Sequence, residues 1–369
     1  MTSPLLQAKP QVAGNRAWLP HMDGLRGLAM VWVVLYHAYV RWPELVPYGN
    51  RFADVPLVAI GWLAVPLFFV QSGYLITRTM YRCDSLADFF ARRWSRLFPA
   101  MAMCSALLFL TAPLFPERPQ GQPSWIDLLP GLTFVDDAWW SKVLGQRIKP
   151  MEGSFWTMYV EIKFYVAAAL LHRWRGERAV VVGLGALFFV GVLLWLGTHR
   201  LGLIESPRIE KLMVQGSLLH FGWFALGALF CFCERQGRGV YNVWSLLLAA
   251  VSSFVVAEGV LVHTLCGLVL CVAFAASLHN RSVQRVLSNR VFCFLGFVSY
   301  PLYLLHENIL VSTLIKLGRI APSAVHPFLP FVVFVGLMSV AYPIARFFEP
   351  WAESLLRSRL FRRAKSRSR

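Results

Sequence analysis

The chain has 369 residues, of which 57% are hydrophobic and only 15% are charged. Soluble domains carry about 25% charged residues, so this composition excludes a soluble globular protein and indicates an integral membrane protein. The net charge of +17 does not indicate a nucleic-acid partner, because the positive charges cluster between apolar segments, as the positive-inside rule predicts.

Ten apolar segments approach the roughly 20 residues that a helix needs to cross a bilayer. They are 25–41, 55–76, 97–115, 155–172, 179–197, 217–234, 241–257, 259–278, 291–315 and 328–347. This pattern predicts an all-α, polytopic bundle of about ten transmembrane helices. An eight-span arrangement stays open, because the seventh and eighth segments are separated by only a residue or two.

The arginines and lysines predict the orientation of the bundle. They concentrate in the loops that follow even-numbered spans and in the C-terminal tail. Because cytoplasmic loops carry the positive excess, we expect both termini in the cytoplasm. The domains expected are a cytoplasmic segment at 1–20 without a signal peptide, a membrane domain at 21–348 and a basic tail at 349–369.

Two connections are long. The inner loop 78–96 contains LADFFARRWSRLF, whose apolar residues and arginines fit an amphipathic helix at the membrane interface. The outer segment 116–154 is rich in Pro and Trp. Within it, 126–134 is too short to span the membrane, but its length suits a re-entrant half-helix.

The first span carries an unusual polar stripe. Arg26 and His37 are eleven positions apart, so they point the same way on a helix and are separated by about 16 Å of rise. Asp23 lies one turn before Arg26 on the same stripe. Ionisable groups are costly inside a membrane and by default indicate function.

Counting helical rise from the span limits predicts that three titratable residues share one depth. His37, Glu161 and His306 fall about 18, 21 and 22 Å from the inner surface. A neutral imidazole accepts a proton from a hydroxyl, so His37 is the candidate general base and Glu161 its candidate partner. The alternative for each histidine is a structural hydrogen bond between helices.

Two further groups lie near the predicted inner surface. Ser72 and Gly73 either permit close helix packing or let the backbone approach a ligand from the cytoplasm. Arg92, Arg93 and Arg96 either anchor an interfacial helix to lipid or hold the phosphates of a nucleotide-like donor. Lys163 cannot share the face of Glu161, so we expect it to snorkel or to pair with another helix.

These stretches together resemble the acyltransferase family 3 membrane O-acyltransferases of bacteria. The first span matches the family's Arg, ten residues, then His at Arg26 and His37. The other matches follow in the family's order: 68–77 resembles FFxxSGFLIT, 93–99 RxxRxxP, 156–165 WSLxVEEQFY and 296–306 GxxSYxxYLxH. The resemblance covers about residues 20 to 350 of this chain.

The resemblance implies transfer of an acyl group, usually acetyl from acetyl-CoA, to a hydroxyl of a polysaccharide, lipid-linked sugar or glycoside at the bacterial cytoplasmic membrane. His37 would act as general base or acyl carrier, together with Glu161. The residues expected near the acyl-CoA are Arg26, Ser72, Gly73, Arg93 and Arg96. The expected supporting residues are Asp23, Trp156, Tyr300, Tyr303 and His306. We expect no metal cofactor and no nucleic-acid partner, and the oligomeric state stays open.

The chain departs from the family pattern at a few positions. Ile162 and Lys163 replace an acid and a Gln, and Glu307 and Asn308 replace the usual residues after the last His. These departures bear on the acceptor more than on the reaction. Two other functions are open: a carrier of acyl groups or lipid-linked sugars that catalyses no transfer, and a membrane scaffold.

Overall fold

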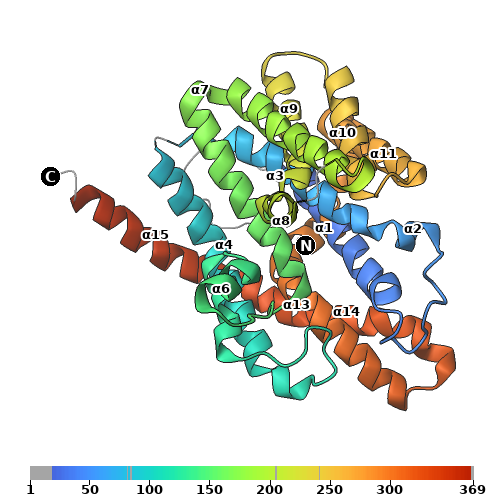
Figure 1. Cartoon of the computed structure of the whole chain (residues 1–369). Helices are drawn as coiled ribbons and strands as arrows, with labels where there is room; N and C mark the ends of the chain where they lie inside the picture. Colours follow the sequence, from blue (N-terminus) through green and yellow to red (C-terminus); the bar gives the residue numbers. More distant parts are fainter. Residues whose placement is uncertain (1–18, 81, 84, 204–205, 241, 367–369) are drawn as a thin grey trace.

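The computed structural model describes residues 19–366 except 81, 84, 204, 205 and 241, and at 211, 212, 214 and 359–366 it describes only the backbone. Nearly all of the expected segment 1–20 therefore lies outside the described residues. The described chain is helical and contains no strand, as the composition and periodicity predict (Figure 1).

Ten of the α-helices form the body of the structure or extend from it. They are α1 (Pro20–Tyr36), α3 (Ala64–Met80), α4 (Leu86–Leu110), α7 (Trp156–Trp195), α9 (Phe221–Arg235), α10 (Val243–Val256), α11 (Leu261–His279), α13 (Arg290–Ile320), α14 (Leu329–Pro343) and α15 (Glu349–Ser366). Shorter helices connect them: α2 (Pro56–Ala59), α5 (Leu129–Thr133), α6 (Asp137–Leu144), α8 (Pro207–Gly216) and α12 (Arg281–Leu287).

Among the described residues, five helical stretches are long and apolar enough to cross a membrane. They are Gly153–Arg200, Leu218–Arg235, Leu261–His279, Arg290–Ile320 and Ser323–Ser358. The first contains two of the expected spans, 155–172 and 179–197. They meet at a break in α7, where Arg175 and Gly176 leave helical geometry. Expected segments 25–41, 55–76, 97–115 and 241–257 are also largely helical but are shorter, interrupted or more polar.

The helices form a continuous series across the bundle. α14 packs on α13, α13 on α1, α1 on α3, α3 on α9, and α9 on α7 and α10 (Figure 1). The C-terminal α15 packs on α4 and then extends away from the bundle, which the red ribbon in Figure 1 shows. Helix α1 with its polar stripe therefore lies in the interior of the series.

Glycines allow α1 and α13 to approach closely. A side chain at Gly27 would overlap the backbone of Phe292 and Gly296, and one at Gly296 would overlap the backbone of Asp23. Close backbone contact through small residues is the usual way that helices pack tightly in a membrane. Because His37 lies ten residues after Gly27 and His306 ten residues after Gly296, the two imidazoles arrive at the same height.

The start of α7 lies inside the bundle. The residues that lead into it through the 3-10 turn η6 (Gly153–Phe155) are buried, including Met151, Glu152 and Phe155 at 0% exposure. From there the contacts run antiparallel to α13: Thr157 meets Tyr303, and Glu152 meets Asn308. The end of the loop 116–154 thus enters the bundle before the helix begins.

Candidate active site

His37 stands where α1 changes into a single π-helical turn, η2 (His37–Arg41). Such turns are rare and occur often at functional sites. Its Nδ1 lies 2.9 Å from the carbonyl oxygen of Val33. Because a carbonyl only accepts hydrogen bonds, Nδ1 carries the proton of the neutral ring, and the lone pair is at Nε2. The ring is thus oriented to accept a proton at Nε2.

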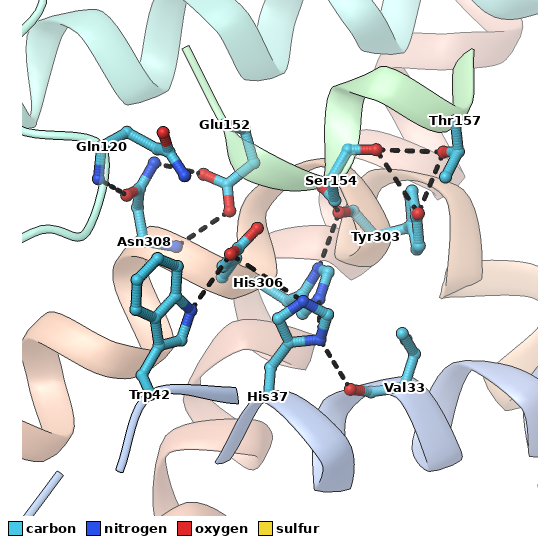
Figure 2. A network of polar contacts seen from close by, with 11 residues as sticks. Val33, His37, Trp42, Gln120, Glu152, Ser154, Thr157, Tyr303, His306 and Asn308 are labelled. Atoms are coloured by element: carbon cyan, nitrogen blue, oxygen red, sulfur yellow. Dashed lines mark hydrogen bonds and ion pairs between the residues drawn. The ribbon is translucent and has the colours of Figure 1, made fainter. Parts of the chain in front are cut away.

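His306 meets His37 from α13 (Figure 2). The ring centroids are 4.7 Å apart and the planes are nearly perpendicular. His306 is fully buried, and its Nδ1 lies 2.8 Å from the carbonyl oxygen of Tyr303. By the same argument Nδ1 of His306 donates, so its Nε2, 3.3 Å from Nδ1 of His37, accepts. The expected equal depth of the two histidines is therefore observed.

A carboxylate that the sequence did not place in the site lies beside the histidines. Glu307 Oε1 accepts a hydrogen bond of 3.1 Å from Trp42 Nε1 and lies 3.9 Å from His37 Nε2. Its other side faces Gly153, where an added side chain would overlap the carboxyl group. The sequence contained two signals: Glu307 directly follows His306 in an apolar helix, and it departs from the family pattern at that position.

A second buried carboxylate completes this end of the network. Glu152 accepts hydrogen bonds from the backbone and side-chain amides of Asn308, at 2.8 and 2.7 Å (Figure 2). Burial raises the pKa of Glu152, and the negative charge of Glu307 raises it further. Arg118 lies close enough to favour the charged form of Glu152. No motif in the sequence pointed to Glu152, because a lone Glu in a polar loop is usually exposed.

Glu161 does not lie beside His37, and the expected pairing of these two residues was wrong. Its Oε1 instead accepts hydrogen bonds of 2.6 Å from the hydroxyls of Ser72 and Tyr165. Thr157 is level with Tyr303, and Glu161 follows one turn later, about 6 Å farther from His306 along the antiparallel α7. The depth estimate placed the start of this helix at the outer surface, whereas the helix begins inside the bundle.

Glu161 belongs instead with the basic residues at the Arg26 end of α1. Arg26 lies in the electrostatic field of Glu161 and Arg96, and its guanidinium is 3.6 Å from Asp23. Arg93 interacts with Glu161 and Arg96. The residues of the expected donor side therefore gather around one carboxylate.

Arg93 is positioned by side-chain contacts. It donates to the hydroxyl of Thr79 and lies over the rings of Phe89 and Tyr165. The guanidinium of Arg96, in contrast, belongs to an exposed residue. An exposed guanidinium beside a half-buried one is suited to a negatively charged ligand that arrives from the surface.

The remaining predicted residues have diverse surroundings. Gly73 contacts the backbone of Phe224 in α9, which is the helix-packing alternative. The hydroxyl of Tyr300 donates to the carbonyl of Leu97 at 3.0 Å. Trp156 is 42% exposed and its ring lies 5.1 Å from that of His220.

The structure also shows the surroundings of Lys163, for which snorkelling and pairing were both open. Lys163 pairs with Asp136 of the outer loop at 3.2 Å, so it has a partner rather than a purely snorkelling role. In the part of the chain that the structure describes, no group of three or more His, Cys, Asp or Glu side chains is arranged to hold a metal ion.

The polar residues form two clusters, and Tyr303 and Thr157 lie between them. We call the first the histidine cluster, made of His37, His306, Glu307 and Trp42. We call the second the arginine cluster, made of Arg26, Arg93, Arg96, Glu161 and Ser72. Between them, Thr157 Oγ1 and the hydroxyl of Tyr303 are 2.9 Å apart. This geometry suits an anionic ligand at one end and proton transfer at the other.

Comparison with known proteins supports the resemblance seen in the motifs. Two curated proteins of Staphylococcus aureus are similar to the chain: O-acetyltransferase OatA of strain NCTC 8325 / PS 47, 24% identical over 349 residues, and putative O-acetyltransferase SACOL0978 of strain COL, 22% identical over 339 residues. The matches cover 80% and 78% of this chain but only 51% and 50% of those proteins. The chain therefore spans about half the length of these relatives. No solved structure matches it.

The family model described as an acyltransferase domain matches residues 19–346. That range contains both clusters and every helix from α1 to α14. The chain therefore belongs to acyltransferase family 3.

Proposed function

We propose that this protein is a membrane O-acyltransferase that moves an acyl group, acetyl in the first instance, from cytoplasmic acyl-CoA to a hydroxyl of a carbohydrate or glycoconjugate. The observation that carries the proposal is His37, whose Nδ1 is engaged by Val33 and whose Nε2 is free to accept a proton. Membership of the family and the names of the two relatives support the reaction class.

In this proposal the donor binds at the arginine cluster. The phosphates of CoA are anionic, and guanidinium groups bind phosphate oxygens in a bidentate manner. Arg26 and His37 are separated by about 16 Å along α1, so the extended pantetheine arm carries the thioester from one cluster towards the other. The placement of this end in the cytoplasm follows from the positive-inside rule.

The acceptor hydroxyl reaches the histidine cluster from the opposite end. Nε2 of His37 removes the hydroxyl proton as the oxygen attacks the thioester carbonyl carbon. A carbon–oxygen bond forms, the carbon–sulfur bond breaks, and its electron pair leaves with sulfur. The proton on His37 finally passes to the CoA thiolate, so the products are an ester and free CoA. If His37 carries the acyl group transiently, a nitrogen–carbon bond forms as the carbon–sulfur bond breaks. In a second step that nitrogen–carbon bond breaks as the carbon–oxygen bond of the ester forms.

The test is transfer by the purified protein in proteoliposomes of bacterial lipid. Radiolabelled acetyl-CoA is the donor, and envelope glycan of a bacterial host stripped of its esters by mild base is the acceptor. We expect base-labile label in the glycan, and a loss of about 100-fold or more in the His37→Ala variant. The matched control is His263→Ala, in which the lost imidazole packs against Trp62 of another helix rather than in either cluster.

Three results would contradict the proposal. Exchange of label across the membrane without ester formation would indicate a carrier. Full activity of a stably inserted His37→Ala protein would remove His37 from the chemistry. The acyltransferase reaction itself would be wrong if neither acetyl-CoA nor longer acyl-CoA donors acylated the glycan or small glycosides.

A further inference from the structure

Glu307 is a departure from the family pattern that the structure places against His37. The distance of 3.9 Å between its Oε1 and His37 Nε2 is too long for a hydrogen bond but short for two charges in a buried site. The two side chains are only 4% and 13% exposed, so water screens their interaction weakly. The carboxylate therefore faces the same nitrogen that the proposed reaction protonates.

The position of Glu307 is determined from two sides. Trp42 Nε1 donates to Oε1 at 3.1 Å, and Trp42 is itself covered by the guanidinium of Arg41, 4.7 Å from the ring centroid. On the other side, Gly153 leaves the room that the carboxyl group occupies, since an added Cβ would overlap both of its oxygens. A side chain held in this way is preorganised rather than free to turn away.

The other titratable and charged groups around His37 do not duplicate this role. His306 of α13 engages Nδ1, not Nε2, and it is a neutral acceptor in that contact. Glu152, on the loop before α7, is occupied by Asn308. On its own helix, the ring of Tyr36 meets His37 edge-on and Arg41 lies over Trp42. Glu307 is thus the carboxylate that the described structure brings to Nε2.

We infer that Glu307 is the positioning residue of the histidine cluster: its carboxylate, held by Trp42 against His37, stabilises the imidazolium form that arises when Nε2 takes the acceptor proton. It takes the part that the sequence suggested for Glu161. The inference rests on the proposed function and adds to it a residue whose charge sets the pH range of the reaction. It also explains why the buried Glu307 stands beside the half-buried Trp42 at a point where an apolar pair would pack without cost.

The experiment compares rate profiles against pH for the full-length protein in the proteoliposome assay with acetyl-CoA and stripped envelope glycan. In Glu307→Gln we expect kcat to fall about ten-fold or more. We also expect the acidic limb of the profile to move to lower pH by about one unit, because a charge that favours the protonated base is gone. The KM for acetyl-CoA, which depends on the other cluster, stays within two-fold (about the measurement error).

Matched variants separate the charge from the fold. Glu307→Asp keeps the carboxylate and should leave the acidic limb near its wild-type position. Glu44→Gln removes an exposed carboxylate two residues from Trp42 and should leave rate and profile unchanged. If Glu307→Gln does not insert, Gly153→Ala displaces the carboxylate while keeping every charge, and the same movement of the limb is expected.

An unmoved acidic limb in Glu307→Gln, or in Gly153→Ala where that variant is needed, overturns the inference. This result is distinct from a failure of the proposed function. If the wild-type protein transfers no acyl group, the function is wrong; if it transfers acetyl and depends on His37, but not on the charge at 307, only the role of Glu307 is wrong.

Discussion

At the scale of single residues, exposure distinguishes an arginine that is accessible to the donor from arginines whose side chains are engaged by neighbouring residues. Arg93 is fixed by Thr79 and by two aromatic rings, whereas Arg96 is exposed beside it. Arg92, one residue from Arg93 on the same helix, pairs with Asp88 at 2.7 Å. The three arginines of one short segment therefore have three different surroundings.

This difference makes a prediction for Arg96. Arg96→Gln should raise the KM for acetyl-CoA about ten-fold and change kcat little, because one charge-assisted contact to a phosphate is lost. Steady-state kinetics in proteoliposomes measure both constants. Arg92→Gln is the control, since it removes the same charge from a residue that already has an acidic partner. Equal effects of the two substitutions would favour a general electrostatic attraction to lipid or donor.

At the scale of elements, the contact between α1 and α13 aligns the histidine cluster. The helices run in the same direction, and both histidines follow the contacting glycines by ten residues. Ten residues of helical rise separate each histidine from its contacting glycine, so the two histidines lie at the same height along the helix pair, whatever the tilt of the pair. The glycines therefore contribute to chemistry that occurs about 15 Å away from them.

Gly296→Ala tests this alignment. The added Cβ meets the backbone of Asp23, so α1 and α13 must move apart, at a cost of about 1–3 kcal/mol in the free energy of unfolding. We expect a lower melting temperature in detergent and a loss of transfer activity. Gly336→Ala on α14 is the matched control: no heavy atom lies within 4 Å of its added Cβ, and Ala favours helix over Gly by about 1 kcal/mol. A Gly296→Ala protein as stable and active as Gly336→Ala would contradict the close contact.

At the scale of the whole molecule, the two clusters give the bundle a direction. The arginine cluster lies towards the start of α1, and the histidine cluster lies where the loop 116–154 enters the bundle. The proposed reaction needs the donor end to face the cytoplasm. The orientation of the loop relative to the C-terminal helix therefore decides whether the proposal is feasible in a cell.

Cysteine labelling measures that orientation. Arg147→Cys in the outer loop should react with a membrane-impermeant thiol reagent in intact cells. Ser358→Cys in α15 should react only after the membrane is opened. Both positions are exposed, and the unsubstituted protein, whose described cysteines are buried or half-buried, gives the background. Labelling of both positions from the same side would contradict the predicted topology.

The sequence by itself determined the helical membrane class, the polar stripe of Asp23, Arg26 and His37, and the family. The class follows from composition, the stripe from helical period and rise, and the family from the resemblance of five motifs in order. It also predicted that His37 and His306 share a depth. That equal depth needed only the limits of the two spans and the rise along each helix.

Only the tertiary structure decided which carboxylate faces His37. Counting placed Glu161 there, but the loop before α7 folds into the bundle and starts that helix deeper, next to Tyr303. The same inward loop brings Gly153 and Glu152 to α13 and makes room for Glu307. Periodicity fixes where a residue points on its own helix, whereas the depth and rotation of one helix against another depend on packing that no single segment encodes.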